Sequence, residues 1–467
     1  MHMPQEDNNN LSIVVLAAGE GKRMKSKLPK VLHQICGRAL ISCVLDPILA
    51  LGAGEVALVV GKDSDEVVKA AGHGQRIVVQ AEQKGTGHAV MAALDGMDPR
   101  FTEVMVLPGD TPLIDFETLQ RLITARRSTR AAASMLAAEL GDPTGYGRVV
   151  RGLSGEVEQI VEETDATPEQ REIMEVNTCM YVFERASLEQ GLASLTPDNR
   201  QGEYYLTDVV KSFTSRGLSV LAVEAPADQV LGINDRAQLA EAARIMRGRI
   251  NTELMRQGVT ILDPDQTYID GGVRVGRDTL IMPMVHLTGQ TVIGADCSIG
   301  PCTSVNDSTV GDGCDIQYSW VDGCEIEAGA NVGPFSRLRP GCRLGPDSKA
   351  GSFVEMKKTI VGRGSKVPHL SYMGDTEIGE DANVGAGSIT CNYDGENKYQ
   401  TRIGDRAFIG SDTMMVAPVN IGDDAVTGAG SVISEDVPDG SLAIERTKQK
   451  IIPDYRKTRK GKKAGGK

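Results

Sequence analysis

Residues 269–305 read IDGGVRVGRDTLIMPMVHLTGQTVIGADCSIGPCTSV, and an aliphatic side chain returns at every sixth position. The positions are Ile269, Val275, Ile281, Leu287, Ile293, Ile299 and Val305. Neither an α-helix, with about 3.6 residues per turn, nor a strand, with side chains alternating every two residues, has this period. A six-residue period fits a prism of three faces made of short parallel strands, in which one aliphatic side chain per repeat points inward. A surface meander with accidental spacing is the alternative, and the unbroken run of in-phase residues disfavours it.

The same period returns later in the chain. It is seen at Ile326, Val332, Leu338, Leu344, Ile378, Val384, Ile403 and Ile409. The sequence therefore predicts a left-handed parallel β-helix. Two stretches interrupt the repeat: 388–402 is too long for a corner and is expected to protrude as a loop, and 355–374 is expected to depart from the scaffold. Function concentrates in loops of this kind.

The first half of the chain follows a different pattern, in which short aliphatic runs alternate with helix-like segments. Strands are predicted at 11–16, 55–60, 76–80, 103–107 and 131–138, and helices at 39–51, 64–71, 87–96 and 114–127. This alternation predicts a Rossmann-like α/β domain with a mainly parallel sheet covered on both faces. Ligands of such sheets bind at the carboxyl ends of the strands.

A long helix is predicted between the two patterns, from Asp235 to Gly258. Apolar residues recur there at helical spacing, and Asp235 can cap the first turn. We therefore expect four parts: an α/β domain at 1–234, a helical linker at 235–262, a β-helix at 263–449 and a basic, disordered tail at 450–467.

Composition narrows the choice of partners and compartment. The net charge of −13 disfavours nucleic acid as the main partner. The nine cysteines have no zinc-type spacing, so reduced and mostly buried thiols are expected. No signal peptide precedes the first apolar run, and no apolar stretch approaches the roughly 20 residues of a membrane span. A soluble, cytoplasmic protein is expected.

The loop after the first predicted strand has the composition of a phosphate site. It reads LAAGEGKRM at 16–24, followed by LPK at 28–30. Small residues let the backbone approach a phosphate, while Arg23 and Lys30 can neutralise charge that builds up during transfer. The loop has neither the third glycine of a dinucleotide-binding loop nor the Gly-Lys-Ser/Thr of a Walker A loop. A generic glycine turn is the remaining alternative.

This loop resembles the signature of sugar-phosphate nucleotidyltransferases. Further motifs are QAEQKGTGH at 80–88, PGD at 108–110, GYGR at 145–148, IVE at 160–162 and EVNT at 175–178. Together they are similar to those of one family, the bifunctional N-acetylglucosamine-1-phosphate uridyltransferases/glucosamine-1-phosphate N-acetyltransferases, from about residue 11 to 450.

The resemblance implies two reactions that together make UDP-N-acetylglucosamine, a precursor of peptidoglycan and lipopolysaccharide. In the C-terminal domain, acetyl-CoA would acetylate glucosamine-1-phosphate. In the N-terminal domain, N-acetylglucosamine-1-phosphate would take the uridylyl group of UTP and release pyrophosphate. The second reaction depends on alignment and charge neutralisation, because the attacking phosphate is already an anion.

The resemblance also implies the residues of the N-terminal site. Arg23 and Lys30 would be catalytic, and Asp110 and Asn234 would hold Mg²⁺, which prefers oxygen ligands. Contacts to UTP and the UDP-sugar would come from Leu16, Ala17, Ala18, Gly19, Lys30, Gln80, Gly85, Thr86, Gly147, Glu162, Asn177 and Asn234. Pro108 departs from members with an aromatic residue at this position; a backbone contact would survive the change, whereas a hydroxyl contact would not.

Acetyl transfer needs a base for the ammonium proton and a donor for the developing oxyanion. His286 and His369 are the only histidines in this half. His286 falls in a regular repeat and is expected to be a surface or packed residue, whereas the resemblance makes His369 the base. It assigns the amino-sugar phosphate to Arg339, Lys357, Tyr372, Asn383 and Asn392. It assigns acetyl-CoA to Ala386, Asn392, Tyr393, Ser411, Ala429 and Arg446, in a homotrimer with acetyl sites between neighbouring chains.

Two other functions fit parts of the sequence. One is a nucleotidyltransferase whose β-helix serves only assembly or regulation; His369, the ITCNYDG stretch at 389–395 and Arg446 disfavour it, because a structural prism needs none of them. The other is a metal-dependent hydratase on the same prism, which would need several histidine ligands where the sequence offers two.

Overall fold

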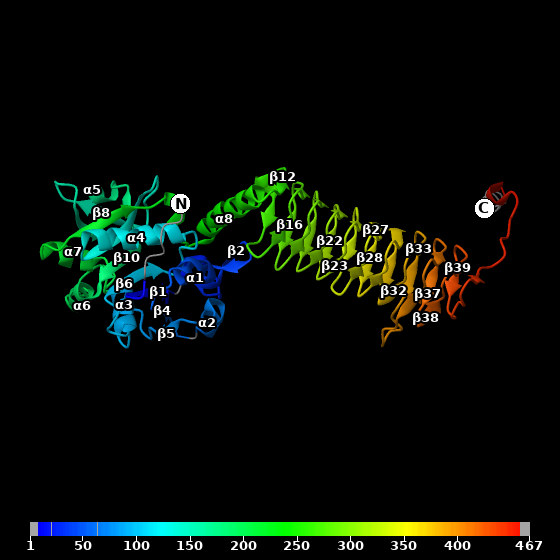
Figure 1. The fold of residues 1–467 in the computed structure, drawn as a ribbon, viewed down its shortest axis with the longest axis horizontal. Coiled ribbons are helices and arrows are strands. Elements are labelled where there is room, and N and C mark those ends of the chain that lie inside the picture. Colours follow the sequence, from blue (N-terminus) through cyan, green and yellow to red (C-terminus); the bar gives the residue numbers. More distant parts are fainter. Residues whose placement is uncertain (1–7, 20, 63, 458–467) are drawn as a thin grey trace, which may run out of the picture. The chain divides into compact units, whose positions relative to one another are not determined.

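The computed structural model describes residues 8–19, 21–62 and 64–457, and the chain divides after Arg249 into two compact units (Figure 1). Most of the predicted basic tail, from residue 458 onward, lies outside the described residues. In the described part, no helix combines the length and apolar character needed to cross a membrane.

A nine-stranded sheet forms the centre of the N-terminal unit, in the order β11-β7-β10-β6-β1-β4-β5 with the β8–β9 hairpin added to β10. The strands are β1 Leu11–Ala17, β4 Glu55–Val60, β5 Arg76–Val79, β6 Glu103–Pro108, β7 Ala133–Glu139, β8 Gly147–Arg151, β9 Val157–Val161, β10 Glu175–Glu184 and β11 Val220–Glu224; β2 Gln34–Ile35 and β3 Arg38–Ala39 form a separate hairpin. The five predicted strands are confirmed. β1 pairs in parallel with β4 and β6, while β10 runs antiparallel to β6 and β7, so the sheet is mainly parallel.

Helices cover both faces of this sheet (Figure 1). They are α1 Leu40–Ala50, α2 Asp65–Ala71, α3 Thr86–Leu94, α4 Phe116–Thr129, α5 Pro168–Arg171, α6 Arg185–Ala193 and α7 Asp208–Ser215. Ile13 and Val15 of β1 pack in a core with α1, α2 and α4, whereas Val14 between them packs in a second core with α3, α6 and α7. The two-residue alternation of a strand thus supplies both cores, as the α/β pattern predicts.

The predicted long helix is confirmed as α8, Arg236–Arg256. The Asp235 carboxylate accepts a hydrogen bond from the Gln238 N–H at 2.9 Å and so caps the first turn. Arg249 donates to the Leu113 carbonyl at 2.6 Å and belongs to the N-terminal unit. Asn251 is fully buried and donates to the carbonyls of Pro264 and Thr267, at 2.8 and 3.0 Å. The division into units therefore falls within the helix.

The C-terminal unit consists of three parallel sheets, which we call faces 1, 2 and 3. Face 1 contains β12 Thr260–Ile261, β15 Leu280–Ile281, β18 Ser298–Ile299, β21 Asp315–Ile316, β24 Asn331–Val332, β27 Lys349–Ser352, β30 Lys366–His369, β33 Asn383–Val384, β36 Phe408–Ile409, β39 Val426–Thr427 and β41 Leu442–Ala443. Face 2 contains β13 Tyr268–Ile269, β16 His286–Thr288, β19 Ser304–Asn306, β22 Trp320–Asp322, β25 Arg337–Leu338, β28 Glu355–Lys357, β31 Tyr372–Gly374, β34 Ile389–Cys391, β37 Met414–Val416 and β40 Val432–Ile433. Face 3 contains β14 Arg274–Val275, β17 Val292–Ile293, β20 Thr309–Val310, β23 Glu325–Ile326, β26 Arg343–Leu344, β29 Ile360–Val361, β32 Thr376–Ile378, β35 Thr401–Ile403 and β38 Val419–Ile421.

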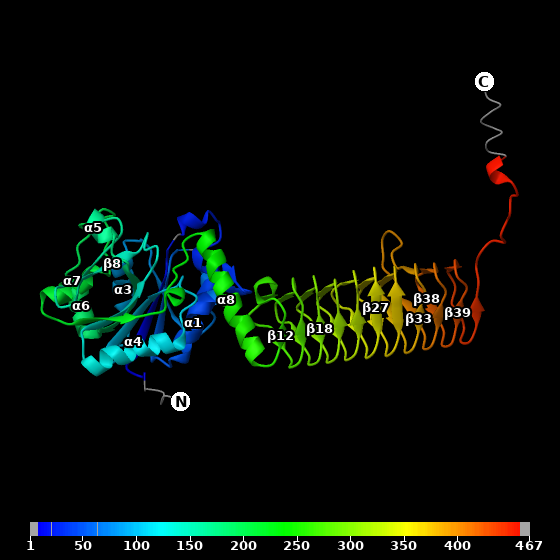
Figure 2. The same cartoon turned by 90° about the horizontal axis from the view of Figure 1, so that it is seen from above.

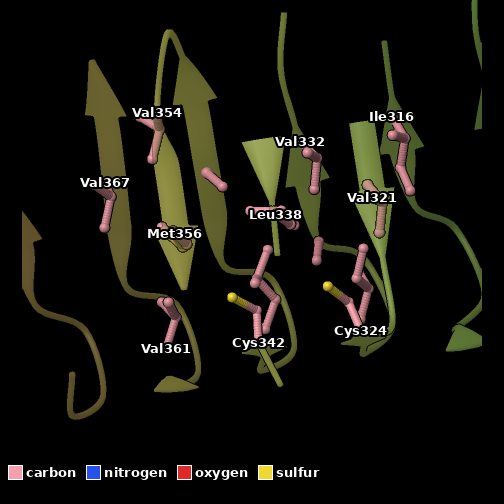
Figure 3. Close-up of a cluster of buried hydrophobic side chains, with 14 of the residues drawn as sticks. Ile316, Val321, Cys324, Val332, Leu338, Cys342, Val354, Met356, Val361 and Val367 are labelled. Atoms are coloured by element: carbon pink, nitrogen blue, oxygen red, sulfur yellow. The ribbon is translucent and has the colours of Figure 1, made fainter. Parts of the chain in front are cut away.

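The chain visits the three faces in turn, and each strand pairs in parallel with the strand one coil further along (Figure 2). Ile281 is paired with Ile299 on face 1 and Leu287 with Val305 on face 2. Their side chains are buried in one continuous core of mainly aliphatic residues. Figure 3 shows a later part of this core, with side chains from Ile316 to Val367. The predicted left-handed parallel β-helix is confirmed, and each coil is stabilised mainly by its two neighbours.

The two predicted interruptions have different outcomes. Residues 355–374 do not depart from the scaffold: β28 to β31 continue the repeat in register, with Met356 paired to Met373 and Val361 to Ile378, so that prediction is wrong. The repeat looks blurred because Val361 follows Met356 one residue sooner than a six-residue period requires. The predicted loop at 388–402 is confirmed. Residues 392–400 form a loop between β34 and β35, and a bridge between Tyr393 and Lys398 closes it.

All nine cysteines lie in the described residues and are present as thiols rather than disulfides. Cys43, Cys297, Cys314, Cys324 and Cys342 are buried, and the last four belong to the β-helix. His286 lies exposed on face 2 and stacks on Tyr268 with ring centroids 4.6 Å apart, which confirms the expected surface position.

Candidate active sites

A cavity of about 300 Å³ lies where β1, β5 and β6 end. Its walls include the backbone of 16–19 after β1, Gln80 after β5 and Asp110 after β6. Lys30, Gly85 and Thr86 also line it. The structure thus brings most of the predicted UTP residues to the carboxyl edge of the sheet, the position expected for a ligand.

Charge in this cavity is centred on Lys30, the first residue of the short helix η2 (Lys30–Leu32). Its ammonium pairs with the Asp110 carboxylate and donates to the Asn234 Oδ1 at 3.3 Å. The two predicted metal ligands therefore converge on one cation. A carboxylate and an amide oxygen are the ligands that Mg²⁺ prefers, with waters and phosphates completing its shell. The donor set fits such an ion, and the described part of the chain offers no larger cluster of metal ligands.

The loop that carries Asn234 is held at both ends. The Tyr146 hydroxyl accepts the Gly232 N–H at 3.1 Å, and the Asn234 N–H donates to the Gln238 side chain at 2.7 Å. Arg23 is exposed in the short helix η1 (Lys22–Met24) and is absent from the described lining of the cavity. It is close enough to oppose the rise that burial causes in the pKa of Tyr146.

Gln80 is held in a single orientation beside this cavity. It is only 5% exposed, and its amide nitrogen contacts the Gly85 carbonyl at 3.2 Å and the His88 Nδ1 at 3.0 Å. The amide oxygen is left to accept from a ligand. Gly85 has φ of 101°, and a Cβ there would lie 2.6 Å from the Tyr204 carbonyl oxygen, so only glycine fits.

A second cavity of about 190 Å³ adjoins the first, and both are lined by Leu16, Thr86, Cys179 and Glu203. The predicted sugar residue Glu162 lies in its wall, where its carboxylate accepts from the Thr207 hydroxyl at 3.0 Å. Burial raises the pKa of Glu162.

The other two predicted sugar residues lie close to Glu162. A Cβ on Gly147 would come within 3.4 Å of the Glu162 Oε2. Asn177 is 2% exposed, and its Oδ1 accepts from the Tyr181 hydroxyl at 2.8 Å and from the Cys179 N–H at 3.1 Å. The structure therefore groups all three predicted sugar residues.

In the C-terminal unit, polar side chains gather at the ends of the face 2 strands. Asp375 lies between them: it accepts from the Asn392 amide at 2.6 Å and lies 3.7 Å from the Lys357 ammonium. A Cβ on Gly374 would lie 2.5 Å from the Tyr372 hydroxyl and 2.6 Å from the Asn392 amide nitrogen. These two side chains therefore converge over Gly374, and a residue with a side chain would collide with them.

A second lysine completes this basic cluster. Lys398, in the loop 392–400, lies beside Lys357, and a side-chain hydrogen bond with Lys357, together with its charge, lowers the pKa of Lys398. Two neighbouring ammonium groups repel each other, and a bound anion relieves the repulsion. Arg339 extends the cluster and pairs with Glu355 at 3.3 Å. The arrangement can hold a phosphate.

His369 and Asn383 lie apart from this cluster, on face 1. His369 is exposed and ends β30, beside Ser352 of the preceding coil, and among the described residues no side chain hydrogen-bonds to its ring. Asn383 begins β33 next to Lys366. Within one chain the structure places His369 and Asn383 on face 1, whereas the predicted phosphate residues Arg339, Lys357 and Tyr372 lie in or directly after strands of face 2.

The predicted acetyl-CoA residues form a column. Ala386, Ser411 and Ala429 occupy the same corner of successive coils: the Ala386 carbonyl accepts the Asp412 N–H at 2.7 Å, and the Ser411 carbonyl accepts the Gly430 N–H at 2.8 Å. Arg446 donates to the Ala429 carbonyl at 2.9 Å and extends the column. Asn392 and the exposed Tyr393 lie in the loop 392–400.

The residues of these sites that the sequence analysis missed include His88, Tyr205, Thr207, Asp375 and Lys398. His88 stands inside the motif at 80–88, and Lys398 lies in the stretch 388–402 that was expected to be a loop. Tyr205 and Thr207 lie in an irregular segment before α7 that carries no strand pattern.

The fold and the two sites define the class: a nucleotidyltransferase joined to a hexapeptide-repeat transferase. Residues 13–179 match the MobA-like NTP transferase domain. Residues 272–307 match the bacterial transferase hexapeptide, and 400–435 match the hexapeptide repeat of succinyl-transferase.

Full-length relatives identify the family. The chain is 50% identical over 456 residues to the bifunctional protein GlmU of Pelotomaculum thermopropionicum, covering 97% of this chain and 100% of the relative. It is 47% identical over 439 residues to that of Thermoanaerobacter pseudethanolicus, covering 94% and 96%. It is 45% identical over 442 residues to that of Halalkalibacterium halodurans, covering 94% and 97%. The chain belongs to the GlmU family.

The chain is therefore a bifunctional transferase that makes UDP-N-acetylglucosamine, with a uridylyltransferase unit followed by a β-helical acetyltransferase unit. The nucleotidyltransferase unit implies a requirement for a divalent metal ion.

Proposed function

We propose that the N-terminal cavities bind UTP and N-acetylglucosamine-1-phosphate end to end. The observation that carries this proposal is the convergence of Asp110 and Asn234 on Lys30 at the edge of the sheet. Asp110 and Asn234 would hold Mg²⁺, which would neutralise phosphate charge when bound. Gln80 accepts from the base, and the backbone at 16–19 approaches the nucleotide.

The chemistry of this site is displacement at phosphorus. A phosphate oxygen of the sugar phosphate bonds to the α-phosphorus of UTP, and the bond to the β-phosphate oxygen breaks, releasing pyrophosphate. Lys30 and Arg23 supply positive charge as this exchange proceeds. Glu162, Asn177 and the backbone of Gly147 hold the sugar, so that its phosphate is aligned for attack.

In the C-terminal unit, the basic cluster of Arg339, Lys357 and Lys398 holds the phosphate of glucosamine-1-phosphate, with Tyr372 and Asn383 completing the site. His369 takes a proton from the ammonium group. The free amine then bonds to the thioester carbonyl of acetyl-CoA and the bond to sulfur breaks; the nitrogen gives up a further proton, and the sulfur takes up a proton to leave as the CoA thiol.

The acetyl-CoA molecule lies along the corner column. Its contacts come from Ala386, Asn392, Tyr393, Ser411, Ala429 and Arg446. The small side chains of the column leave room for the pantetheine arm beside the coils.

The assembly we propose is a homotrimer. Exposed apolar side chains stack along the corner between faces 1 and 2, which we call the apolar corner: Met284, Cys302, Tyr318, Phe335, Phe353 and Leu370. The Phe335 ring lies 5.5 Å from that of Tyr318 and 5.2 Å from that of Phe353. A continuous exposed apolar strip of this kind marks an interface. Since His369 precedes Leu370, a neighbouring chain on this corner would lie beside the base and could complete the site.

Phe335→Asp combined with Phe353→Asp should therefore produce monomers without acetyl transfer, because two carboxylates cannot be buried in an apolar contact. Uridylyl transfer should persist. Sedimentation gives the mass, and thiol and pyrophosphate release give the two activities. Ile360→Asp is the matched control, since Ile360 is exposed on face 3, off the apolar corner. A double variant that remains a trimer, or a monomer with full acetyl transfer, would contradict the assembly.

The two units should also act independently. A fragment of residues 1–249 retains the sheet, both of its cores and Asn234, so it should fold and uridylylate N-acetylglucosamine-1-phosphate without acetyl-CoA. Pyrophosphate release measures the activity, and circular dichroism the fold. A fragment ending at Gly232 is the control, because it lacks Asn234 and should be inactive. A folded but inactive 1–249 fragment would argue against the division.

We place the protein in the cytoplasm. UTP and acetyl-CoA are intracellular substrates, and nine cysteines that form no disulfide suit a reducing compartment.

A further inference from the structure

Cys179 has an unusual backbone. It lies where the pairing of β10 with β7 shifts register, between Asn177 and Tyr181, and its φ is 59°. Residues with a side chain rarely adopt this left-handed conformation, and a β-bulge re-aims the side chain it carries. Positions held in such conformations cluster at ligand sites.

The bulge places Cys179 at the junction of the two N-terminal cavities, since it lines both. One cavity has Lys30, a cation that suits phosphates, and Asp110, which would hold Mg²⁺ beside them. The other has Glu162 and Tyr205. Tyr205 is 8% exposed, and among the described residues its buried hydroxyl has only a loose contact with the Thr164 side chain, so it can turn to a ligand.

When a sugar 1-phosphate spans both cavities, the sugar atoms next to its phosphate lie beside Cys179. These are C1, which bears the phosphate, and C2, which bears the acylamino group. Of the two carbons, only C2 carries a group whose size varies among N-acylated sugars. The Cys179 thiol would therefore contact the acylamino group on C2, and a longer acyl chain would collide with it.

We propose that the side chain of Cys179 limits the size of the 2-acylamino group that the uridylyltransferase accepts. The inference rests on the proposed placement of the sugar beside Glu162. Cys179 acts by volume rather than as a nucleophile: burial raises the pKa of its thiol and keeps it protonated, and only the thiolate is reactive.

The test compares N-acetyl-, N-propionyl- and N-butyryl-glucosamine-1-phosphate as substrates for full-length variants. Cys179→Gly removes the side chain at a position whose φ suits glycine, and it should raise kcat/KM for the N-butyryl sugar relative to the N-acetyl sugar by about tenfold or more, the effect of one or two methylenes in a pocket. Cys179→Ala should give a smaller rise. Cys179→Ser keeps the size and should leave the ratio within about twofold.

Acetyl transfer shows that each variant is folded and should be unchanged. An unaltered ratio in active Cys179→Gly would overturn the inference, as would an equal rise in Cys179→Ser, which would mean that sulfur chemistry rather than size decides. Glu162→Ala distinguishes a failure of the proposed sugar placement from a failure of the proposed role of Cys179. If it leaves KM for the N-acetyl sugar unchanged, the placement of the sugar fails and the inference with it. If it raises KM while Cys179→Gly leaves the ratio unaltered, only the role of Cys179 is overturned.

Discussion

His369→Ala should lower acetyl transfer about 10²- to 10⁴-fold, the contribution of a positioned general base. Its ring is exposed at the end of β30, free to meet an ammonium group, and no other histidine lies among the coils near the basic cluster. Uridylyl transfer should be unchanged. Release of the CoA thiol and of pyrophosphate, measured on one preparation, separates the two reactions.

His286→Ala is the matched control for this prediction. His286 is the other histidine of the unit and stacks on Tyr268, well before the coils that carry the site. Both activities should survive its loss. Equal losses in the two variants would point to damage of the coils instead of loss of a base.

Hybrids extend the same experiment to the shared site. When His369→Ala and Arg446→Ala chains are co-expressed, some trimers contain a site free of both defects, provided that neighbouring chains supply the two residues. Part of the acetyl transfer should then return. Its absence in hybrids verified by mass would place both residues in a site within one chain.

Lys30→Ala should slow uridylyl transfer about 10²- to 10³-fold, the usual loss for one preorganised charge contact in a transition state. Lys30 is the cation on which Asp110 and Asn234 converge, so its loss also leaves Asp110 without its ion pair. The measurement is pyrophosphate release at saturating substrates and Mg²⁺, and acetyl transfer should remain intact. Arg23→Ala should act in the same direction.

Lys27→Ala is a suitable control for Lys30→Ala. Lys27 belongs to the same loop, is exposed and lies outside the described lining of the cavity at Asp110. It should retain nearly full activity. If Lys30→Ala releases pyrophosphate at the wild-type rate, the phosphate site has been assigned to the wrong residues.

The architecture could be predicted from the sequence because its periods are simple. The run from Ile269 to Val305 maps onto consecutive strands β13 to β19. Beyond Val305 the six-residue period no longer locates every inward-facing residue, because some corners are one residue shorter. Val310 lies five positions after Val305, and Val321 lies five positions after Ile316. A count of six cannot follow such corners, whereas hydrogen bonding between coils keeps the faces aligned.

The candidate sites were predictable only where a motif carries them. Asp110 and Gln80 follow strands and stand in motifs, and the structure brings both to one cavity. Lys398 meets Lys357 only because the loop 392–400 folds back, which no local pattern predicts. Cys179 enters the cavities through a shift in strand pairing that depends on β7, a segment distant in sequence.

The register between coils determines where this protein can gain or lose residues over evolutionary time. On face 1, Val332 pairs with Ile316, whereas Ile409 pairs with Val384 across a much longer stretch of chain, yet both pairs stack in the same core. A residue inserted within a face would turn every later aliphatic side chain outward. The same residue inserted at a corner leaves the faces in phase. Length variation is therefore confined to the corners, close to the residues proposed for the acetyl site, so the scaffold can stay constant while the substrates it serves diverge.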